Sequence, residues 1–418
     1  MKTQPLKKII CLAFAAALLL TGCSQKAETV TPSAKWESAI ENLPEDFIFG
    51  MDASSVLAEE KSGVRYYGFD GKEQDVFKTL SESGINYIRL RVWNDPYDEN
   101  GKGYGGGNND VPTAIELGKR ATEYGMKVCI DYHYSDFWAD PKRQHSPKAW
   151  KGMTMDEKSS ALYEFTKASL KKLLDAGVDI GMIQIGNEIN YGMTGETYFP
   201  NIVTLLKSGS KAIREVSSEY GKDIAIVVHY TRIEDKSDVL YLVSRLCQND
   251  LDFDMIGMSY YSYWDGDMEN MESVLKEIRE KYGKKVFLAE TSYAYTTEDG
   301  DGFDNSFSSG DEVEGYEASV EGQAAILHDI CEYVNKAGGI GIFYWEGTWI
   351  PVEPASRDNS PIWEEYGSGW ATSYSADYDP EDAGLYYGGC SWDNQALFDF
   401  EGYPLESLKV FSYIRNGK

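Results

Sequence analysis

The sequence is short of positive charge. Its 418 residues contain 68 Asp and Glu against 40 Lys and Arg, so the formal net charge is −28. Such a chain repels phosphate backbones and anionic lipid headgroups, which argues against nucleic acid or an anionic membrane surface as a partner. A neutral ligand is compatible with this charge, and the charge also keeps an exported protein soluble.

Cysteine is also scarce, and no two cysteines form a recognisable motif. Beyond the N-terminal segment they are Cys129, Cys247, Cys331 and Cys390. Their spacing contains no Cys-x-x-Cys pair and no zinc-binding pattern. Cys129 lies in an apolar run, which predicts a buried free thiol. The spacing demands no disulfide and excludes none.

The apolar run near the N-terminus is too short to span a membrane. It covers residues 9–20, whereas a spanning helix needs about 20 residues. A basic start followed by a run of this length is typical of a signal peptide. The run ends in Leu20-Thr21-Gly22-Cys23, which resembles a bacterial lipobox. An ordinary signal peptide with an incidental cysteine is the alternative.

The lipobox resemblance implies a division of the chain and a location. Residues 1–22 are the predicted signal peptide, and Cys23 is the predicted lipidation site. Residues 23–40 are polar and are predicted to be a flexible tether, which leaves residues 41–418 as the predicted folded domain. We expect an exported protein, anchored by lipid to the bacterial cell surface or extracellular, whose only membrane contact is the lipid.

Aromatic residues, in contrast, are plentiful, and so are short apolar runs. The chain has 30 Tyr and 10 Trp; core packing takes many of them, and such rings also stack on sugar faces. From Phe47 onward eight apolar runs alternate with helical patterns, several of which end at a glycine. Eight β-then-α units predict an α/β fold, a single (β/α)8 TIM barrel with long loops at the C-terminal face of the strands. The predicted strands are 47–53, 86–93, 127–134, 182–188, 224–230, 255–261, 285–291 and 339–345, and the helical patterns include 111–124, 155–176, 201–220, 268–282 and 316–337.

Two glutamates end strands that lie across the predicted barrel from one another. Glu188 follows the fourth strand and Glu290 ends the seventh. Active sites of this fold form at the C-terminal ends of the strands, so the two side chains are expected to face each other. Glycoside hydrolysis needs two carboxyl groups of this kind, one protonated and one ionised. The alternative for a lone strand-end glutamate is a solvated or ion-paired side chain.

Several segments resemble a known family of hydrolases. Asn187-Glu188 with a second glutamate on the seventh strand resembles clan A of the glycoside hydrolases. Longer segments across residues 47–400 resemble glycoside hydrolase family 53, the endo-β-1,4-galactanases. These segments are Phe49-Gly50-Met51-Asp52-Ala53-Ser54-Ser55, Ile88-Arg89-Leu90-Arg91-Val92-Trp93, Asp131-Tyr132-His133-Tyr134-Ser135-Asp136-Phe137-Trp138-Ala139-Asp140-Pro141, Gln184-Ile185-Gly186-Asn187-Glu188 and Leu288-Ala289-Glu290-Thr291-Ser292-Tyr293.

The resemblance implies an activity and roles for the two glutamates. Glu188 would be the acid/base and Glu290 the nucleophile of a hydrolase that retains anomeric configuration. The substrate would be plant galactan or galacto-oligosaccharides, cleaved by a monomer without an organic cofactor. Glu188 should then have a raised pKa and Glu290 a depressed one. Arg91 is expected to keep Glu290 ionised, with a plain salt bridge as the alternative. Asn187 is expected to hydrogen-bond the sugar 2-hydroxyl, with a turn role as the alternative.

Further substrate contacts are expected after the third and eighth strands. His133 is either an orienting residue or a contact to a sugar hydroxyl. Asp140-Pro141-Lys142-Arg143 resembles a substrate-contacting stretch of the family, with a solvated loop as the alternative. Trp345, Trp349 and Trp370, together with Trp138, are candidate stacking platforms for which core packing is the rival interpretation. Trp345 is expected to form the floor of the cleaved subsite.

An acidic loop after the seventh strand resembles a calcium site. Oxygen-bearing side chains alternate with glycines in Asp299-Gly300-Asp301-Gly302-Phe303-Asp304-Asn305, although the pattern is not that of an EF-hand. Some family members bind calcium here and so join this loop to the one after the eighth strand. Carried over, the ligands of a structural Ca²⁺ would be Asp299, Asp301, Asn305, the backbone carbonyl of Phe303, Asp393 and the carbonyl of Cys390. A solvated acidic turn is the alternative.

Two other functions compete with a galactanase. The first is a different clan A glycanase, such as a mannanase or cellulase, which Asn187, Glu188 and Glu290 by themselves do not exclude. The second is a non-catalytic lipoprotein that captures sugars for a transporter. Such proteins have two lobes and need no paired glutamates, so the eight repeated units disfavour it.

Overall fold

The computed structural model describes residues 35–418. The predicted signal peptide, Cys23 and residues 24–34 of the predicted tether lie outside the described residues. Residues 35–40 are packed against the domain, because Trp36 and Ile40 are buried and the ring of Trp36 lies 5.6 Å from that of Tyr413. The predicted tether boundary at residue 40 is therefore too late. In the described part of the chain no helix is both long enough and apolar enough to cross a membrane.

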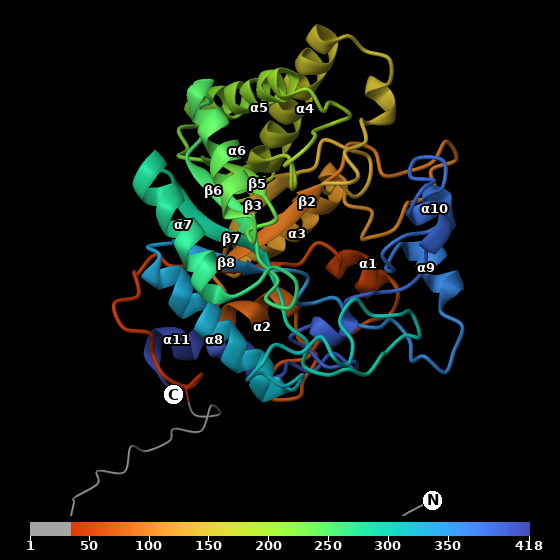
Figure 1. The fold of residues 1–418 in the computed structure, drawn as a ribbon. Helices are drawn as coiled ribbons and strands as arrows, with labels where there is room; N and C mark the ends of the chain where they lie inside the picture. Colours follow the sequence, from red (N-terminus) through yellow and green to blue (C-terminus); the bar gives the residue numbers. More distant parts are fainter. Residues whose placement is uncertain (1–34) are drawn as a thin grey trace, which may run out of the picture. The chain divides into compact units, whose positions relative to one another are not determined.

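Eight strands form a closed barrel in which each lies parallel to its neighbours in the sequence, and the last pairs with the first (Figure 1). Every predicted strand is confirmed to within a few residues at its ends. Almost every strand residue is buried, as expected for strands covered on both faces. The strands are β1 (Ile48–Asp52), β2 (Tyr87–Val92), β3 (Lys127–Tyr132), β4 (Ile180–Ile185), β5 (Ala225–Tyr230), β6 (Met255–Ser259), β7 (Lys285–Thr291) and β8 (Gly341–Tyr344).

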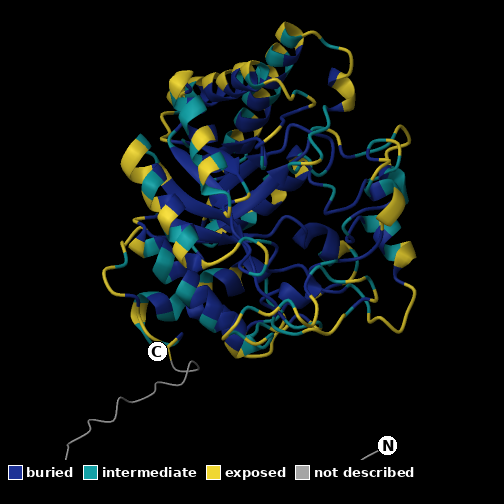
Figure 2. Ribbon diagram, in the orientation of Figure 1, coloured by how far each residue is buried: buried dark blue, intermediate teal, exposed yellow. Residues whose placement is uncertain are grey.

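Helices surround the barrel and bury only their inner faces, so that exposed residues lie on the outside of the ribbon (Figure 2). Local signals set their ends: Thr154 and Glu157 form a capping box at the start of α4, and Gly283 ends α7 with φ +66°. The eight predicted β-then-α units require a helix between β5 and β6, and α6 lies there. The pattern predicted at 316–337 starts too early, because Ser319 caps α8. The helices are α1 (Val56–Lys61), α2 (Val76–Glu82), α3 (Val111–Glu123), α4 (Met155–Asp175), α5 (Phe199–Tyr220), α6 (Lys236–Gln248), α7 (Met268–Tyr282), α8 (Val320–Lys336), α9 (Ser360–Tyr366), α10 (Ala383–Tyr386) and α11 (Val410–Asn416).

Apolar side chains fill the inside of the barrel at the N-terminal ends of the strands. Phe287, Phe343 and Met182 belong to this inner cluster, together with Cys129, which is buried and free as predicted. Gly50 on β1 makes room for Phe343, since a Cβ at residue 50 would lie 2.2 Å from its ring. Because apolar side chains fill the barrel at the N-terminal ends of the strands, polar groups inside it occupy the half nearer the C-terminal ends.

The segment after β8 is less irregular than its sequence indicates. Residues 349–400 are rich in Gly, Trp and Tyr and show little helical pattern, but they contain α9, α10 and two single-turn 3-10 helices. The segment lies against the loop after β3: the indole of Trp138 donates to the carbonyl of Trp370 at 2.9 Å, and the hydroxyl of Tyr378 contacts Ser135 at 2.9 Å. These long-range contacts order the loops over the C-terminal ends of the strands.

Candidate active site

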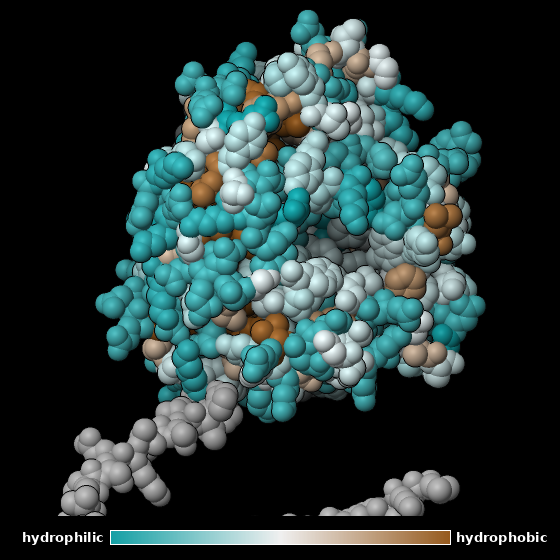
Figure 3. All heavy atoms as spheres, viewed as in Figure 1, coloured by the Kyte–Doolittle hydropathy of each residue, from teal (hydrophilic) through white to brown (hydrophobic). Residues whose placement is uncertain are grey.

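A cleft of about 860 Å³ opens where the strands end. Both predicted catalytic glutamates and all ten predicted substrate contacts line it, so residues from β2, β3, β4, β7 and β8 meet at one place. On the face shown in Figure 3 the surface of the molecule is otherwise mostly hydrophilic. The predicted residues in the cleft are Arg91, His133, Asp140, Pro141, Lys142, Arg143, Asn187, Glu188, Glu290, Trp345, Trp349 and Trp370.

Glu188 lies just beyond β4, on a backbone turned sharply out of the strand. Gly186 has φ +90° and Glu188 itself has φ +47°, a conformation uncommon for a residue with a side chain. Such strain of roughly 1–3 kcal/mol is found where function requires a particular side-chain direction. Here it presents the carboxyl group to the cleft, and Oε1 accepts a hydrogen bond of 2.7 Å from the hydroxyl of Ser259.

Glu290 ends β7 and is held more tightly. Its side chain is 8% exposed, and Oε1 lies 2.9 Å from Nη1 of Arg89. The hydroxyl of Tyr261 donates to Oε2 at 2.9 Å. One oxygen is thus paired with a cation and the other accepts a neutral donor, which suits an ionised carboxylate fixed in one orientation.

The two glutamates differ in how strongly they hold a proton. Burial and the negative charge of Glu290 raise the pKa of Glu188 well above its ordinary value. Burial also raises the pKa of Glu290, but Arg89 and the Tyr261 hydroxyl oppose this rise. The expected depression of the Glu290 pKa is therefore wrong, because the cost of burying the charge exceeds the gain from Arg89. The expected order of the two pKa values is kept, because the pKa of Glu188 is raised more strongly than that of Glu290.

The arginine that contacts Glu290 is Arg89, and the prediction for Arg91 is wrong. Both side chains face the barrel interior, since residues two apart on a strand point the same way. Arg91 lies one layer nearer the rim, where its guanidinium pairs with Glu346 after β8 and lies 4.3 Å from the ring of Trp138. It lines the cleft without touching Glu290, and its guanidinium also lies 6.0 Å from the ring of Trp345.

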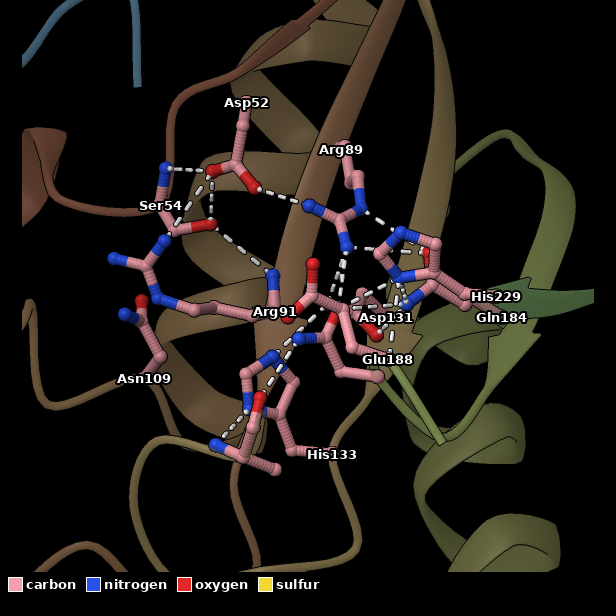
Figure 4. Close-up of polar contacts among 12 residues, drawn as sticks. Asp52, Ser54, Arg89, Arg91, Asn109, Asp131, His133, Gln184, Glu188 and His229 are labelled. Atoms are coloured by element: carbon pink, nitrogen blue, oxygen red, sulfur yellow. Dashed lines mark hydrogen bonds and ion pairs between the residues drawn. The ribbon is translucent and has the colours of Figure 1, made fainter. Parts of the chain in front are cut away.

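Arg89 is the centre of a buried polar network. Its guanidinium pairs with Asp52 at 3.1 Å and with Asp131 at 2.8 Å, in addition to Glu290. Figure 4 shows it between Asp52 on one side and Gln184 with His229 on the other. Nη2 also donates to Oδ1 of Asn187 at 2.9 Å. One cation therefore fixes three carboxylates and orients the asparagine beside Glu188.

Asn187 and His133 have different capacities to bind a ligand. The Asn187 amide donates to the carbonyl of Ala139 at 2.8 Å, which leaves its second N–H directed at no described residue. Both ring nitrogens of His133 are used: Nε2 contacts Asp131 at 3.0 Å, and Nδ1 accepts from Trp93 at 3.1 Å. His133 is thus an orienting residue, and Asn187 keeps a donor for a sugar hydroxyl.

The remaining predicted contacts form the walls of the cleft. Arg143 pairs with Asp140 on its own loop and with Asp382 on the segment after β8, so the two loops meet over the cleft. Trp345 is partly exposed and packs 4.7 Å from the ring of Trp392. Trp349 is 1% exposed, so core packing is its main role, whereas Trp138, Trp345 and Trp370 are each partly exposed where they line the cleft.

Sequence reasoning missed several residues of the site. Arg89 and Arg91 belong to the same motif on β2, and they differ only in their depth in the barrel, with Arg91 nearer the C-terminal end of the strand. Ser259 ends β6, and Tyr261 follows it two residues later. Trp264, which lines the cleft and is 54% exposed, follows in the next loop. His229, buried on β5, gave no signal because its neighbours in the sequence form an ordinary apolar strand.

The predicted calcium residues come together at the loops after β7 and β8. Asp299, Asp301 and Asp393 each offer a carboxylate oxygen within 4.8 Å of the others. Burial raises the pKa of Asp301 to about 6, and burial with the charge of Asp301 raises that of Asp393 to about 8. Asn305 donates to Asp393 at 2.7 Å, and its amide oxygen is buried without a partner among residues 35–418.

Phe303 and Cys390 lie beside this cluster. The backbone N–H of each donates to a carboxylate oxygen of Asp301, both at 2.8 Å. The donor set contains only hard oxygen atoms on the side chains, which is the chemistry that Ca²⁺ prefers.

Known proteins resemble the chain over most of its length. A family model described as glycosyl hydrolase family 53 matches residues 48–411. An endo-β-1,4-galactanase of Bacillus subtilis (strain 168) is 48% identical, and the alignment covers 99% of each chain. An arabinogalactan endo-β-1,4-galactanase of Cellvibrio japonicus (strain Ueda107) is 32% identical over 74% of this chain and 82% of that protein. The solved GH53 catalytic domain of Ignisphaera aggregans has a TM-score of 0.81 and 38% identity, covering 91% of this chain and 99% of that one.

Proposed function

The chain belongs to glycosyl hydrolase family 53, and from that membership we propose that it hydrolyses internal β-1,4-galactosidic bonds of galactan and type I arabinogalactan. The observation that carries the proposal is the pair of glutamates in one cleft, of which one holds a proton strongly and the other is paired with Arg89. A retaining glycosidase needs this division of roles.

In the first step Glu290 is the nucleophile and Glu188 the acid. The Glu290 carboxylate attacks the anomeric carbon, and the bond from that carbon to the leaving oxygen breaks as Glu188 transfers its proton to that oxygen. The product is a galactosyl ester of Glu290 and a shortened chain. Arg89 and Tyr261 stabilise Glu290 as a carboxylate before the attack, and they orient it.

In the second step Glu188 is the base. As a carboxylate it takes a proton from water, whose oxygen attacks the anomeric carbon and releases Glu290. Two displacements restore the original anomeric configuration. The free N–H of Asn187 is directed at the sugar 2-hydroxyl, a contact that strengthens in the transition state, and Trp345 forms the floor below the cleaved sugar.

Incubation with soluble polysaccharides, followed by chromatography of the products, tests the function. Linear galactan should yield a falling series of oligosaccharides, which is the product pattern of internal cleavage. Faster cleavage of mannan or carboxymethyl-cellulose would indicate a neighbouring clan A activity. Binding of galactan without any product would favour the non-catalytic sugar-binding protein.

A bound Ca²⁺ between the loops after β7 and β8 is part of the proposal. The three clustered carboxylates, together with the unpartnered amide oxygen of Asn305, support it. Asp299, Asp301, Asn305 and Asp393 would hold the ion, with backbone oxygens of Phe303 and Cys390 as further ligands. The ion would join the two loops at one point, and its double positive charge would offset most of the charge of the three carboxylates.

Export as a lipoprotein is also part of the proposal. The lipobox at Leu20-Thr21-Gly22-Cys23 supports cleavage before Cys23 and acylation of that residue. The packed domain begins near Trp36, which is buried. A lipid at residue 23 would therefore hold the domain close to the cell surface. This position suits an enzyme that cuts a polymer too large to enter the cell.

A further inference from the structure

Ser259, at the end of β6, is the only hydroxyl group between Glu188 and a buried histidine in the described part of the chain. Its Oγ donates to Oε1 of Glu188 at 2.7 Å and lies 2.9 Å from Nε2 of His229. Ser259 and His229 are each 0% exposed. Neither residue reaches the substrate, so both act on the reaction only through Glu188.

The direction of the Ser259 hydroxyl depends on which nitrogen of His229 carries the proton. The groups that surround Nδ1 of His229 decide which nitrogen carries the proton, and the amide of Gln184 is one of them. Its Oε1 accepts from Arg89 at 3.2 Å, and its Nε2 donates to Asp131 at 2.6 Å, so its NH₂ group faces Nδ1 of His229 at 3.0 Å. The backbone N–H of Glu188 also points at Nδ1. Oδ1 of Asn187 also lies 2.9 Å from Nδ1, but that oxygen already accepts from Arg89 and from Gln184, whereas a backbone N–H can only donate. Nδ1 is therefore an acceptor.

A neutral imidazole with Nδ1 as acceptor carries its proton on Nε2. Burial and the charge of Arg89 keep His229 neutral, because they lower its pKa well below the ordinary value. Nε2–H then donates to Oγ of Ser259, and the serine hydrogen is left to point at Oε1 of Glu188. The sequence of donors runs from the Arg89 network through His229 and Ser259 to the acid/base.

We propose that Ser259, oriented by His229, is a positioning residue that keeps the transferable proton of Glu188 on Oε2. An oxygen that already accepts the serine hydrogen is a poor place for an acid proton, so the proton occupies the other oxygen. The same hydrogen bond stabilises the carboxylate that must form when Glu188 gives up its proton. The inference deepens the proposed function and rests on the acid/base role of Glu188.

Other groups that face Glu188 stay unchanged when Ser259 is altered. Glu290 on β7 and Asp140 after β3 are the neighbouring carboxylates, and the hydroxyl of Thr231 makes a weaker favourable contact. Arg89 on β2 and Tyr261 after β6 act on Glu290. A change in the titration of Glu188 on removal of Ser259 therefore reports the serine.

The test compares Ser259→Ala with the wild type over pH on two substrates. One is galactotetraose, whose leaving sugar needs a proton. The other is a dinitrophenyl β-1,4-galactobioside, whose leaving group needs none. For galactotetraose, kcat/KM should fall about tenfold at the wild-type optimum, and its alkaline limb should move up by about one pH unit, as expected for loss of one hydrogen bond to a charged group. For the dinitrophenyl substrate kcat/KM should change less than about twofold.

Matched variants separate positioning from folding. Ser169→Ala on α4 removes another buried hydroxyl, which contacts Tyr132 at 2.8 Å, and should leave both substrates and the profile unchanged. Ser259→Thr keeps the hydroxyl and should restore the profile. Ser259→Cys, with a weak donor of similar size, should behave like the alanine variant and replaces it if that variant does not fold.

Two results would overturn the inference. One is a Ser259→Ala profile that coincides with that of the wild type, and the other is an equal loss on both substrates with no movement of the alkaline limb. Glu188→Gln is measured in parallel. If it loses galactotetraose cleavage but keeps the dinitrophenyl reaction while Ser259→Ala changes nothing, only the positioning role is lost. If Glu188→Gln keeps full activity on galactotetraose, the proposed function itself is wrong.

Discussion

Replacement of Arg89 by glutamine should destabilise the protein more at neutral than at acidic pH. Arg89 is 1% exposed and pairs with Asp52, Asp131 and Glu290 at 2.8–3.1 Å. Removal of one partner from a buried pair costs about 3–5 kcal/mol, because the charge left behind stays buried. We therefore expect the free energy of unfolding of Arg89→Gln to fall by about 4 kcal/mol at pH 7.

The pH dependence follows from Glu290 and Asp131, two of the three carboxyl groups that Arg89 contacts. Burial raises the folded pKa of Glu290 above its unfolded value, so the folded state binds more protons and stability falls as pH rises through that window. Without Arg89 the folded pKa of Glu290 rises further, so the pH range over which ionisation of Glu290 destabilises the folded state becomes wider. Burial tends to raise the pKa of Asp131, but Arg89 opposes burial and the folded pKa is lowered overall. The ionised Asp131 therefore stabilises the folded state at pH values above its unfolded pKa. The variant loses this contribution. The penalty of Arg89→Gln should shrink between pH 7 and pH 5.

Urea unfolding at the two pH values measures the penalty as a shift in midpoint at constant slope. The acid limb of kcat/KM should also move up by roughly one to three pH units, since Glu290 loses its cation. Arg120→Gln is the control: this half-buried arginine pairs with Glu60 and Asp75 outside the barrel, so its removal should cost less and leave the pH profile unchanged. Equal penalties at both pH values together with an unmoved acid limb would refute the reasoning.

The other predictions concern the catalytic pair, the ion and the anchor. Glu188→Gln and Glu290→Gln should each keep the wild-type circular dichroism spectrum and lose activity by a factor of about 10²–10⁴, so near-normal hydrolysis by either would reject its role. Chelation should lower the melting temperature of the wild type, because an ion at a hundredfold excess over its Kd adds about 2.7 kcal/mol, and Asp301→Ala should abolish the shift. If the melting temperature is unchanged and elemental analysis finds no metal, the prediction is wrong and the three carboxylates are part of an ordinary acidic loop. Mass spectrometry of the mature N-terminus should find acylated Cys23, and an unmodified chain that begins elsewhere would contradict it.

The sequence predicted the barrel because its strands are buried on both faces and therefore stand out as short apolar runs. A polar residue at the end of such a run, as at Glu188 and Glu290, indicates the site, because all parallel strands end on the same side. These signals are local, and a single sequence contains them. The approximate positions of the strands and the place of both glutamates were predictable for this reason.

Features that depend on contacts between strands were not predictable. Arg89 and Arg91 point the same way from β2, and only the stagger of β7 and β8 decides which of them meets Glu290 and which meets Glu346. The raised pKa of Glu290 depends on how completely the neighbouring strands exclude water. The fold of residues 349–400 depends on bonds such as that from Trp138 to the Trp370 carbonyl, which join segments far apart in the chain.

Covalent trapping of the nucleophile tests the central claim most directly. A 2-deoxy-2-fluoro dinitrophenyl β-1,4-galactobioside should form the glycosyl-enzyme and hydrolyse slowly, because the fluorine destabilises both transition states. Mass spectrometry of the digested protein should then find a single fluorogalactobiosyl group, attached to Glu290, in step with the loss of activity. A label on Glu188 or on any other residue, or rapid turnover of galactan with no adduct on Glu290, would contradict the two-step mechanism assigned to these residues.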